Sequence, residues 1–176
     1  MEKSKLSERW LRGPLPSIPA LLQPIAHALL QAKDEVNSIM KDFPEELLWL
    51  QVAGLASPAF HLQHMKGVID RLFTYAMESQ LNYDQLTYLA EEGKPTTKLY
   101  TLSLLIKSFN DQIDTAIKEL SNVDENTLTK HCEVGRKKLP STAIGLYVHA
   151  AEHIMRHVGQ LLVTVKISRE MNTISL

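Results

Sequence analysis

The stretch "VHAAEHIMRHVGQ", residues 148–160, decides the fold because it has the pattern of an amphipathic helix. At about 100° per residue its apolar side chains gather on one arc of a helical wheel. Histidine recurs every fourth residue beside that arc, at His149, His153 and His157. The row drifts toward the apolar arc along the helix. We therefore expect His153 and His157 to point more nearly into the interior than His149.

The same periodicity predicts three more long helices, and the four together cover residues 20–41, 57–78, 98–120 and 141–169. Ser57 followed by Pro58 is a typical helix start, since the hydroxyl can cap the first turn and proline needs no amide partner there. A short helix is expected within residues 80–93. Residues 121–142 are polar and predict a long connection with at most one helical turn. Strand patterns are almost absent, so the sequence predicts an all-α four-helix bundle.

Composition sets the broad class. The chain has 176 residues, of which 44% are hydrophobic and 22% charged, as expected for one globular domain over residues 1–176. Its proline-rich start, residues 1–17, is expected to be an extended lead-in. The net charge of -1 includes no basic stripe, which argues against a nucleic-acid partner. No apolar run is long enough for a membrane span or a signal peptide, and the single cysteine excludes an internal disulfide, so we expect a cytoplasmic protein.

Five of the seven histidines lie on two helices beside the expected core. The pair His153 and His157 is spaced i, i+4, which places both imidazoles on one helical face within reach of one divalent cation. His61 and His64 lie three residues apart at the apolar side of the helix over residues 57–78. One of them facing the pair would complete three nitrogen ligands and leave a position for water or substrate. Spacing alone equally allows both to pack in the interior without meeting the pair.

The stretches "SPAFHLQHMKGVIDRLFTYA", residues 57–76, and "GLYVHAAEHIMRHVGQLL", residues 145–162, together resemble the DinB superfamily of four-helix-bundle proteins. The resemblance implies long crossover connections and a divalent metal, most simply zinc or nickel, bound by His64, His153 and His157. His61 is the rival for the position of His64. The family also implies a metal-dependent hydrolase or a transferase of a low-molecular-weight thiol, acting on a small molecule, and homodimer formation.

Other side chains near these histidines have both functional and structural interpretations. The resemblance gives His149 a supporting role or a place at the mouth of the site, and it gives weight to Gln160, which ends the family-like "RHVGQ". Groups that could orient ligands or move protons are Glu152, Arg156, Asp70, Arg71 and Tyr75, although surface pairing or core packing is the simpler explanation of each.

Three features outside the two helices have ordinary structural explanations. His27 is expected to pack or lie at the surface, and the basic run Arg136, Lys137 and Lys138 is expected to form a solvated edge rather than an anion site. Cys132 beside His131 invites a nucleophile interpretation, but a thiol in a long loop is more often incidental. An alternative for the whole chain therefore stays open: a non-enzymatic helical module that binds a ligand or partner, with an empty or structural histidine site.

Overall fold

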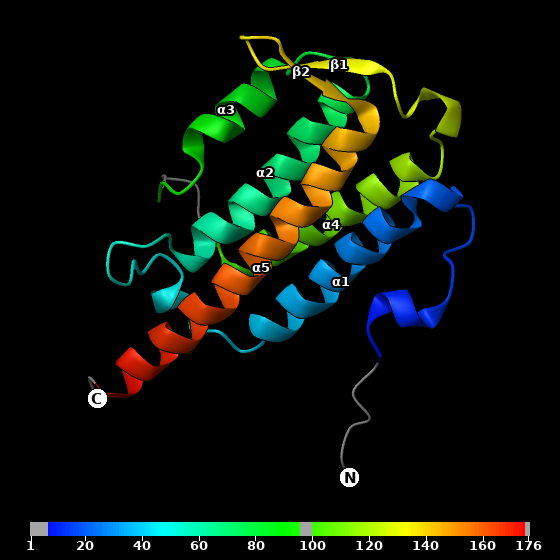
Figure 1. Cartoon of the computed structure of the whole chain (residues 1–176). Coiled ribbons are helices and arrows are strands. Elements are labelled where there is room, and N and C mark those ends of the chain that lie inside the picture. The colour runs from blue at the N-terminus through cyan, green and yellow to red at the C-terminus, as the bar shows by residue number, and fades with distance from the viewer. Residues whose placement is uncertain (1–6, 96–99, 175–176) are drawn as a thin grey trace.

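The computed structural model describes residues 7–95 and 100–174, and its main body is a bundle of four helices (Figure 1). These are α1 (Gln23–Ile39), α2 (Pro58–Ala76), α4 (Leu102–Leu120) and α5 (Ala143–Ile174). Each helix packs against two neighbours, in the cyclic order α1, α4, α2, α5. The all-α four-helix bundle expected from the sequence is confirmed.

The order of the helices requires a long crossover. Figure 1 shows α1 and α5 running in one direction along the bundle and α2 and α4 in the other. The neighbours α2 and α4 are therefore parallel, so the chain must return along the bundle between them, and the short helix α3 (Tyr83–Glu91) lies on this return. Because α2 and α5 are antiparallel neighbours, the first half of α2 lies beside the middle of α5. This arrangement positions the candidate site.

The helices begin where capping residues satisfy their first amides. Ser57 Oγ accepts a hydrogen bond from the amide of Phe60 at 3.2 Å, with Pro58 in the first turn, as expected from the sequence. Asn82 and Gln85 form a reciprocal capping box at the start of α3. Thr101 caps α4 in the same way as Ser57 caps α2.

Side chains from all four bundle helices fill the core. Phe73 of α2 meets Tyr147 of α5 edge to face, with ring centroids 4.9 Å apart, and Phe109 of α4 is fully buried. Such ring contacts add to the free energy gained from apolar burial. The packing between α2 and α5 thus holds in place the two helices that carry the histidines.

Several expected helix boundaries differ from the structure. α1 is shorter than residues 20–41, because Ala20–Leu22 forms a 3-10 turn and the helix ends at Ile39. α2 ends at Ala76 because Glu78 adopts a left-handed backbone with φ 57°, which a continuing helix cannot contain. α4 begins at Leu102, and part of the expected start at residues 98–101 lies outside the described residues. α5 extends to Ile174, beyond the expected end at Arg169.

The long connection before α5 contains a short hairpin that the sequence did not predict. Strands β1 (His131–Val134) and β2 (Leu139–Thr142) form an antiparallel hairpin in which His131 pairs with Thr142 and Val134 with Leu139. The strands are too short to show an alternating pattern, and Pro140 argues against a strand in the sequence. Left-handed backbone at Gly135 and Lys138 makes the tight turn between them. The single helical turn expected in this connection is present as the 3-10 turn Glu125–Thr127.

The lead-in is not extended throughout, contrary to expectation. Arg9–Arg12 forms a 3-10 turn, and the Arg9 guanidinium donates two hydrogen bonds of 2.6 Å to the carboxylate of Asp34 in α1. Paired charge and two parallel hydrogen bonds fasten this segment to the bundle, and the same pairing holds the pKa of Asp34 below its ordinary value.

Candidate metal centre

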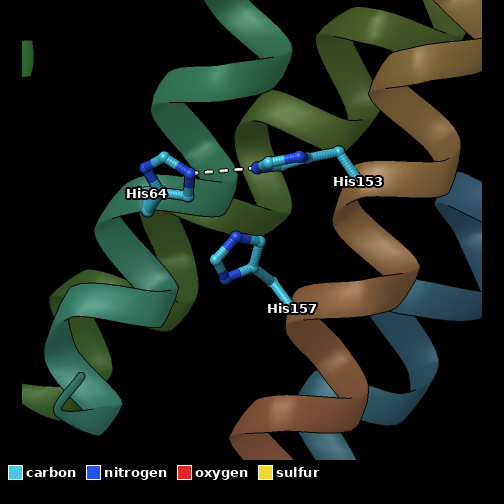
Figure 2. Close-up of side chains that lie close together, drawn as sticks. All are labelled: His64, His153 and His157. Atoms are coloured by element: carbon cyan, nitrogen blue, oxygen red, sulfur yellow. Dashed lines mark hydrogen bonds between the residues drawn. The ribbon is translucent and has the colours of Figure 1, made fainter. Parts of the chain in front are cut away.

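Three imidazoles from two helices converge between α2 and α5. His64 projects from α2 toward His153 and His157 of α5 (Figure 2). One nitrogen from each ring lies within 4.8 Å of the other two, and the Nε2 atoms of His64 and His153 are 3.1 Å apart. The ring centroid of His157 lies 4.6 Å from that of His64 and 4.7 Å from that of His153. The structure therefore brings together the three expected ligands.

The separation of one pair of nitrogens, those of His64 and His153, suits a shared ion. Two nitrogens each about 2.0–2.1 Å from one metal are about 3.3 Å apart in tetrahedral geometry and about 2.9 Å apart in octahedral geometry. The 3.1 Å between the Nε2 atoms of His64 and His153 lies between these values. The separation is therefore compatible with zinc and with nickel alike.

The electrostatics of the site also suit a metal, because imidazole must be neutral to offer a lone pair. Burial, followed by the proximity of His64 and His153, lowers the pKa of His157 to about 3. Burial, His64 and His149 lower the pKa of His153 as well. Positive charge on these rings is thus disfavoured at neutral pH, and the donor set fits a divalent cation.

His64 is held by a carboxylate that the sequence analysis did not single out. Nδ1 of His64 lies 2.7 Å from Oε2 of Glu92, and the other oxygen, Oε1, accepts a 2.6 Å hydrogen bond from Nη1 of Arg71. The side chain of Glu92 is only 5% exposed. A carboxylate behind a histidine is a frequent partner of metal-binding imidazoles. Glu92 follows the end of α3, so only the folding of α3 onto α2 brings it near His64.

His61, the rival for the position of His64, lies elsewhere in the site. Its side chain is buried, and its Nδ1 is 3.0 Å from Nδ1 of His157. The group of three convergent nitrogens does not include His61. His61 therefore supports the ring of His157 from behind, and burial together with His64 lowers its pKa to about 4.

Among the described residues, the ring of His153, the third candidate ligand, has no hydrogen bond at Nδ1 to orient it. Nδ1 of His153 is buried, and within the described part of the chain it has no hydrogen-bond partner. A buried nitrogen without a partner is uncommon in folded proteins and marks a strained or functional position. His64 and His157 have polar partners behind them, whereas His153 is oriented by packing.

A cavity of about 280 Å³ opens beside the three rings, with His64 and His153 in its wall. Apolar side chains of α2, α3 and β1 form most of the rest, and Arg71, Tyr75 and His149 add polar groups. His149 lies at the mouth, since its side chain is 53% exposed. Arg71 and Tyr75, named from the sequence as groups that could orient ligands, thus lie where a bound molecule would touch them.

Gln160 is not part of the group of three convergent nitrogens. It lines a separate groove of about 540 Å³ together with His61 and Arg156. Glu152 pairs with Arg156 at the surface of α5, which is the ordinary structural explanation for both. Asp70 accepts a hydrogen bond of 2.9 Å from Gln85 and so helps to anchor α3 rather than the metal centre.

The remaining candidates have structural roles. Nε2 of His27 lies 3.1 Å from the carbonyl of Gly13, and His27 is not part of the convergent group. The basic run at residues 136–138 is exposed at the hairpin turn, where Lys138 pairs with Glu133 at 3.0 Å. Cys132 is buried in β1, and burial together with Glu78 raises the pKa of its thiol, which disfavours a nucleophilic role.

Comparison with known proteins agrees with this fold. The sequence profile of the DinB superfamily matches residues 28–161, so the chain belongs to that superfamily. No protein of curated function matches the chain. Within the described residues, no helix is both long and apolar enough to cross a membrane.

Two solved structures share the fold at low sequence identity. A conserved protein from Enterococcus faecalis superposes with a TM-score of 0.70 at 15% identity, covering 85% of this chain and 97% of that one. A protein from Streptococcus pneumoniae superposes with a TM-score of 0.59 at 12% identity, covering 83% and 88% of the two chains. At these identities the likeness describes the fold alone.

Proposed function

We propose that this DinB superfamily protein binds one divalent metal ion through His64, His153 and His157 and acts on a small molecule in the adjacent cavity. The observation that carries the proposal is the convergence of three imidazoles from two helices, two of them with lowered pKa values, beside a cavity. Zinc or nickel suits three nitrogen ligands best.

The chemistry proposed is hydrolysis or transfer of a low-molecular-weight thiol. A divalent ion with three neutral ligands keeps its full positive charge and would act as a Lewis acid that favours the deprotonated form of a nearby water or thiol. The protein itself supplies the cavity wall, which excludes water from an apolar portion of the substrate. Arg71 and Tyr75 orient the polar portion, because both side chains line that wall.

Metal analysis tests the first part of the proposal. Protein purified without a histidine tag is expected to retain or take up about one equivalent of zinc or nickel, and His153→Ala is expected to lose most of it, because a two-ligand site binds weakly. His131→Ala is a matched control, since His131 is exposed in the hairpin and is not one of the convergent histidines. Substoichiometric metal that is the same in wild type and His153→Ala would exclude the metal site.

Removal of the metal ion distinguishes the hypothesis of an enzyme from that of a non-enzymatic binding module. If the protein acts catalytically, a chelator should abolish turnover of small thiol acceptors or ester and amide substrates, and added zinc or nickel should restore it. If the ion only supports the structure, the melting temperature should fall with chelator while ligand binding survives. The second result would favour a non-enzymatic helical module.

A further inference from the structure

A continuous hydrogen-bonded bridge runs from α2 to the end of α3 and back to α2. Nη1 of Arg71 donates to Oε1 of Glu92 at 2.6 Å, and Oε2 of Glu92 lies 2.7 Å from Nδ1 of His64. All three side chains are largely buried, with 11%, 5% and 20% of their areas exposed. Each oxygen of the carboxylate therefore has its own partner.

The donors and acceptors of the bridge allow only one position for the proton between His64 and Glu92. A guanidinium can only donate and a carboxylate can only accept, so Nδ1 of His64 must carry the proton that it shares with Glu92. In the neutral ring, Nε2 then carries a lone pair. That nitrogen is the one directed at His153, 3.1 Å away (Figure 2).

The backbone around Glu92 is fixed from both sides. The amide of Gly93 donates to Oε1 of the buried Gln63 at 2.8 Å, and the hydroxyl of Tyr88 donates to the carbonyl of Gln63 at 3.1 Å. Gln85, near the start of α3, bonds Asp70 and Thr74 of α2. α3 buries no side chain of its own fully, so these polar contacts contribute strongly to the position of Glu92.

A glycine in α2 provides the space through which the bridge passes. A Cβ atom at Gly67 would lie 2.5 Å from Nη1 of Arg71 and closer still to Oε1 of Glu92. Real Cβ atoms do not approach other heavy atoms so closely. Glycine costs stability inside a helix, so its presence at the contact point favours a requirement for that space.

From this geometry we infer that Glu92 is a positioning residue that fixes the tautomer of His64 and leaves Nε2 free for a metal ion, and that Arg71 enforces this choice. The link to a metal rests on the proposed function, whereas the tautomer itself is a property of the metal-free protein.

The substitution Glu92→Gln should reverse the tautomer. Arg71 can only donate, so the amide oxygen of the new side chain must face the guanidinium, and the amide nitrogen must then face Nδ1 of His64. Nδ1 becomes an acceptor, and the proton moves to Nε2, where it occupies the position that a metal would need. In the double variant Arg71→Met with Glu92→Gln, the amide is free to turn its oxygen to Nδ1 again.

Two measurements on the full chain test this inference. Long-range proton–nitrogen NMR spectra of metal-free protein at pH about 7.5, above the ordinary histidine pKa, report which nitrogen of His64 carries the proton. Titration with zinc or nickel gives affinity. We expect the Nδ1–H tautomer in wild type, the Nε2–H tautomer in Glu92→Gln with affinity about 10–100-fold weaker, and recovery of about tenfold in the double variant. Glu133→Gln, in the exposed hairpin, is the matched control and should match wild type.

The outcomes separate this inference from the proposed function. An Nδ1–H tautomer that persists in Glu92→Gln would overturn the inference, even if the protein binds metal. A double variant that binds no better than Glu92→Gln would overturn the role of Arg71. A wild type that binds no metal, but whose His64 tautomer reverses in Glu92→Gln, would support the tautomer selection and contradict the proposed function.

Discussion

Nδ1 of His61 lies 3.0 Å from Nδ1 of His157, so one of the two nitrogens must donate and the other must accept. For His157 to present an unprotonated Nε2 to an ion, its Nδ1 must be the donor and His61 the acceptor. His61 is buried and supports the ring of His157 as Glu92 supports that of His64. Two of the three candidate ligands therefore have their own orienting partner.

Removal of that partner should weaken metal binding without removing a ligand. We expect His61→Leu to reduce zinc or nickel affinity about 10–100-fold, the usual effect of losing a group that orients a metal-binding histidine. His61→Asn should lose less, because its side-chain oxygen can accept near the position of Nδ1. Isothermal titration of both variants checks this. Equal losses in the two variants would show that packing, rather than hydrogen bonding, accounts for the effect.

The stability of the metal-free protein should fall as the pH is lowered from about 6.5 toward about 4. Burial lowers the pKa of His61 to about 4 and that of His157 to about 3, whereas unfolded histidine titrates near 6.5. Within this window the unfolded chain binds protons that the folded chain does not, so the free energy of unfolding decreases. The histidine contribution is fully present above the unfolded pKa.

Urea unfolding of the metal-free protein at pH about 7.5 and about 5 measures this dependence. The denaturation midpoint should be lower at the acidic pH, and His157→Gln should show a smaller difference between the two conditions. A midpoint that stays constant across the window would contradict the neutral state assigned to these rings.

Substitution at Gly67 should affect metal binding more than a comparable change elsewhere. Gly67→Ala places a methyl group against Arg71 and Glu92, so we expect displacement of Glu92 and weaker metal affinity. Gly159→Ala in α5 is the matched control, because a Cβ there meets nothing within 4 Å. The control should stabilise the helix by about 0.5–1 kcal/mol. Metal titration and thermal melting of both variants provide the comparison, and equal affinities would argue against a need for space at Gly67.

Truncation of Phe73 should destabilise the pairing of α2 and α5. Phe73 is 2% exposed and meets Tyr147 of α5 edge to face, so Phe73→Ala should cost about 3–5 kcal/mol of unfolding free energy. Trp10→Ala, at a position that is 62% exposed, should change it by less than about 0.5 kcal/mol. Chemical denaturation measures both. A loss below about 1 kcal/mol for Phe73→Ala would mean that this contact contributes little to helix pairing.

The long helices could be predicted because apolar periodicity and capping residues act locally. Ser57 and Pro58 marked the start of α2 correctly, and the wheel of α5 placed His153 and His157 nearer the interior than His149. The hairpin could not be predicted, because its four-residue strands depend on pairing with each other rather than on a local pattern. Pro140 in the second strand makes the hairpin still harder to predict, because proline is uncommon within strands.

The site could be predicted only in part, for the same physical reason. Spacing on single helices brought His153 and His157 to one face, but the choice between His61 and His64 depends on how α2 is rotated against α5. Glu92 could not be found, because α3 must first fold back through contacts such as Gln85 with Asp70. Contacts that join distant segments through polar groups leave no periodic signal in a sequence.

The buried thiol of Cys132 can be used to measure local opening of the structure. The sequence contains one cysteine, and its Sγ lies in β1 beneath the hairpin, 3.8 Å from the carbonyl of Ala76 at the end of α2. Cys132 is 1% exposed, so we expect a thiol reagent to react with this sulfur mainly when the hairpin separates from α2 or the whole bundle unfolds. Labelling kinetics at this single position therefore distinguish a transient excursion at one end of the bundle from global denaturation, without an engineered probe.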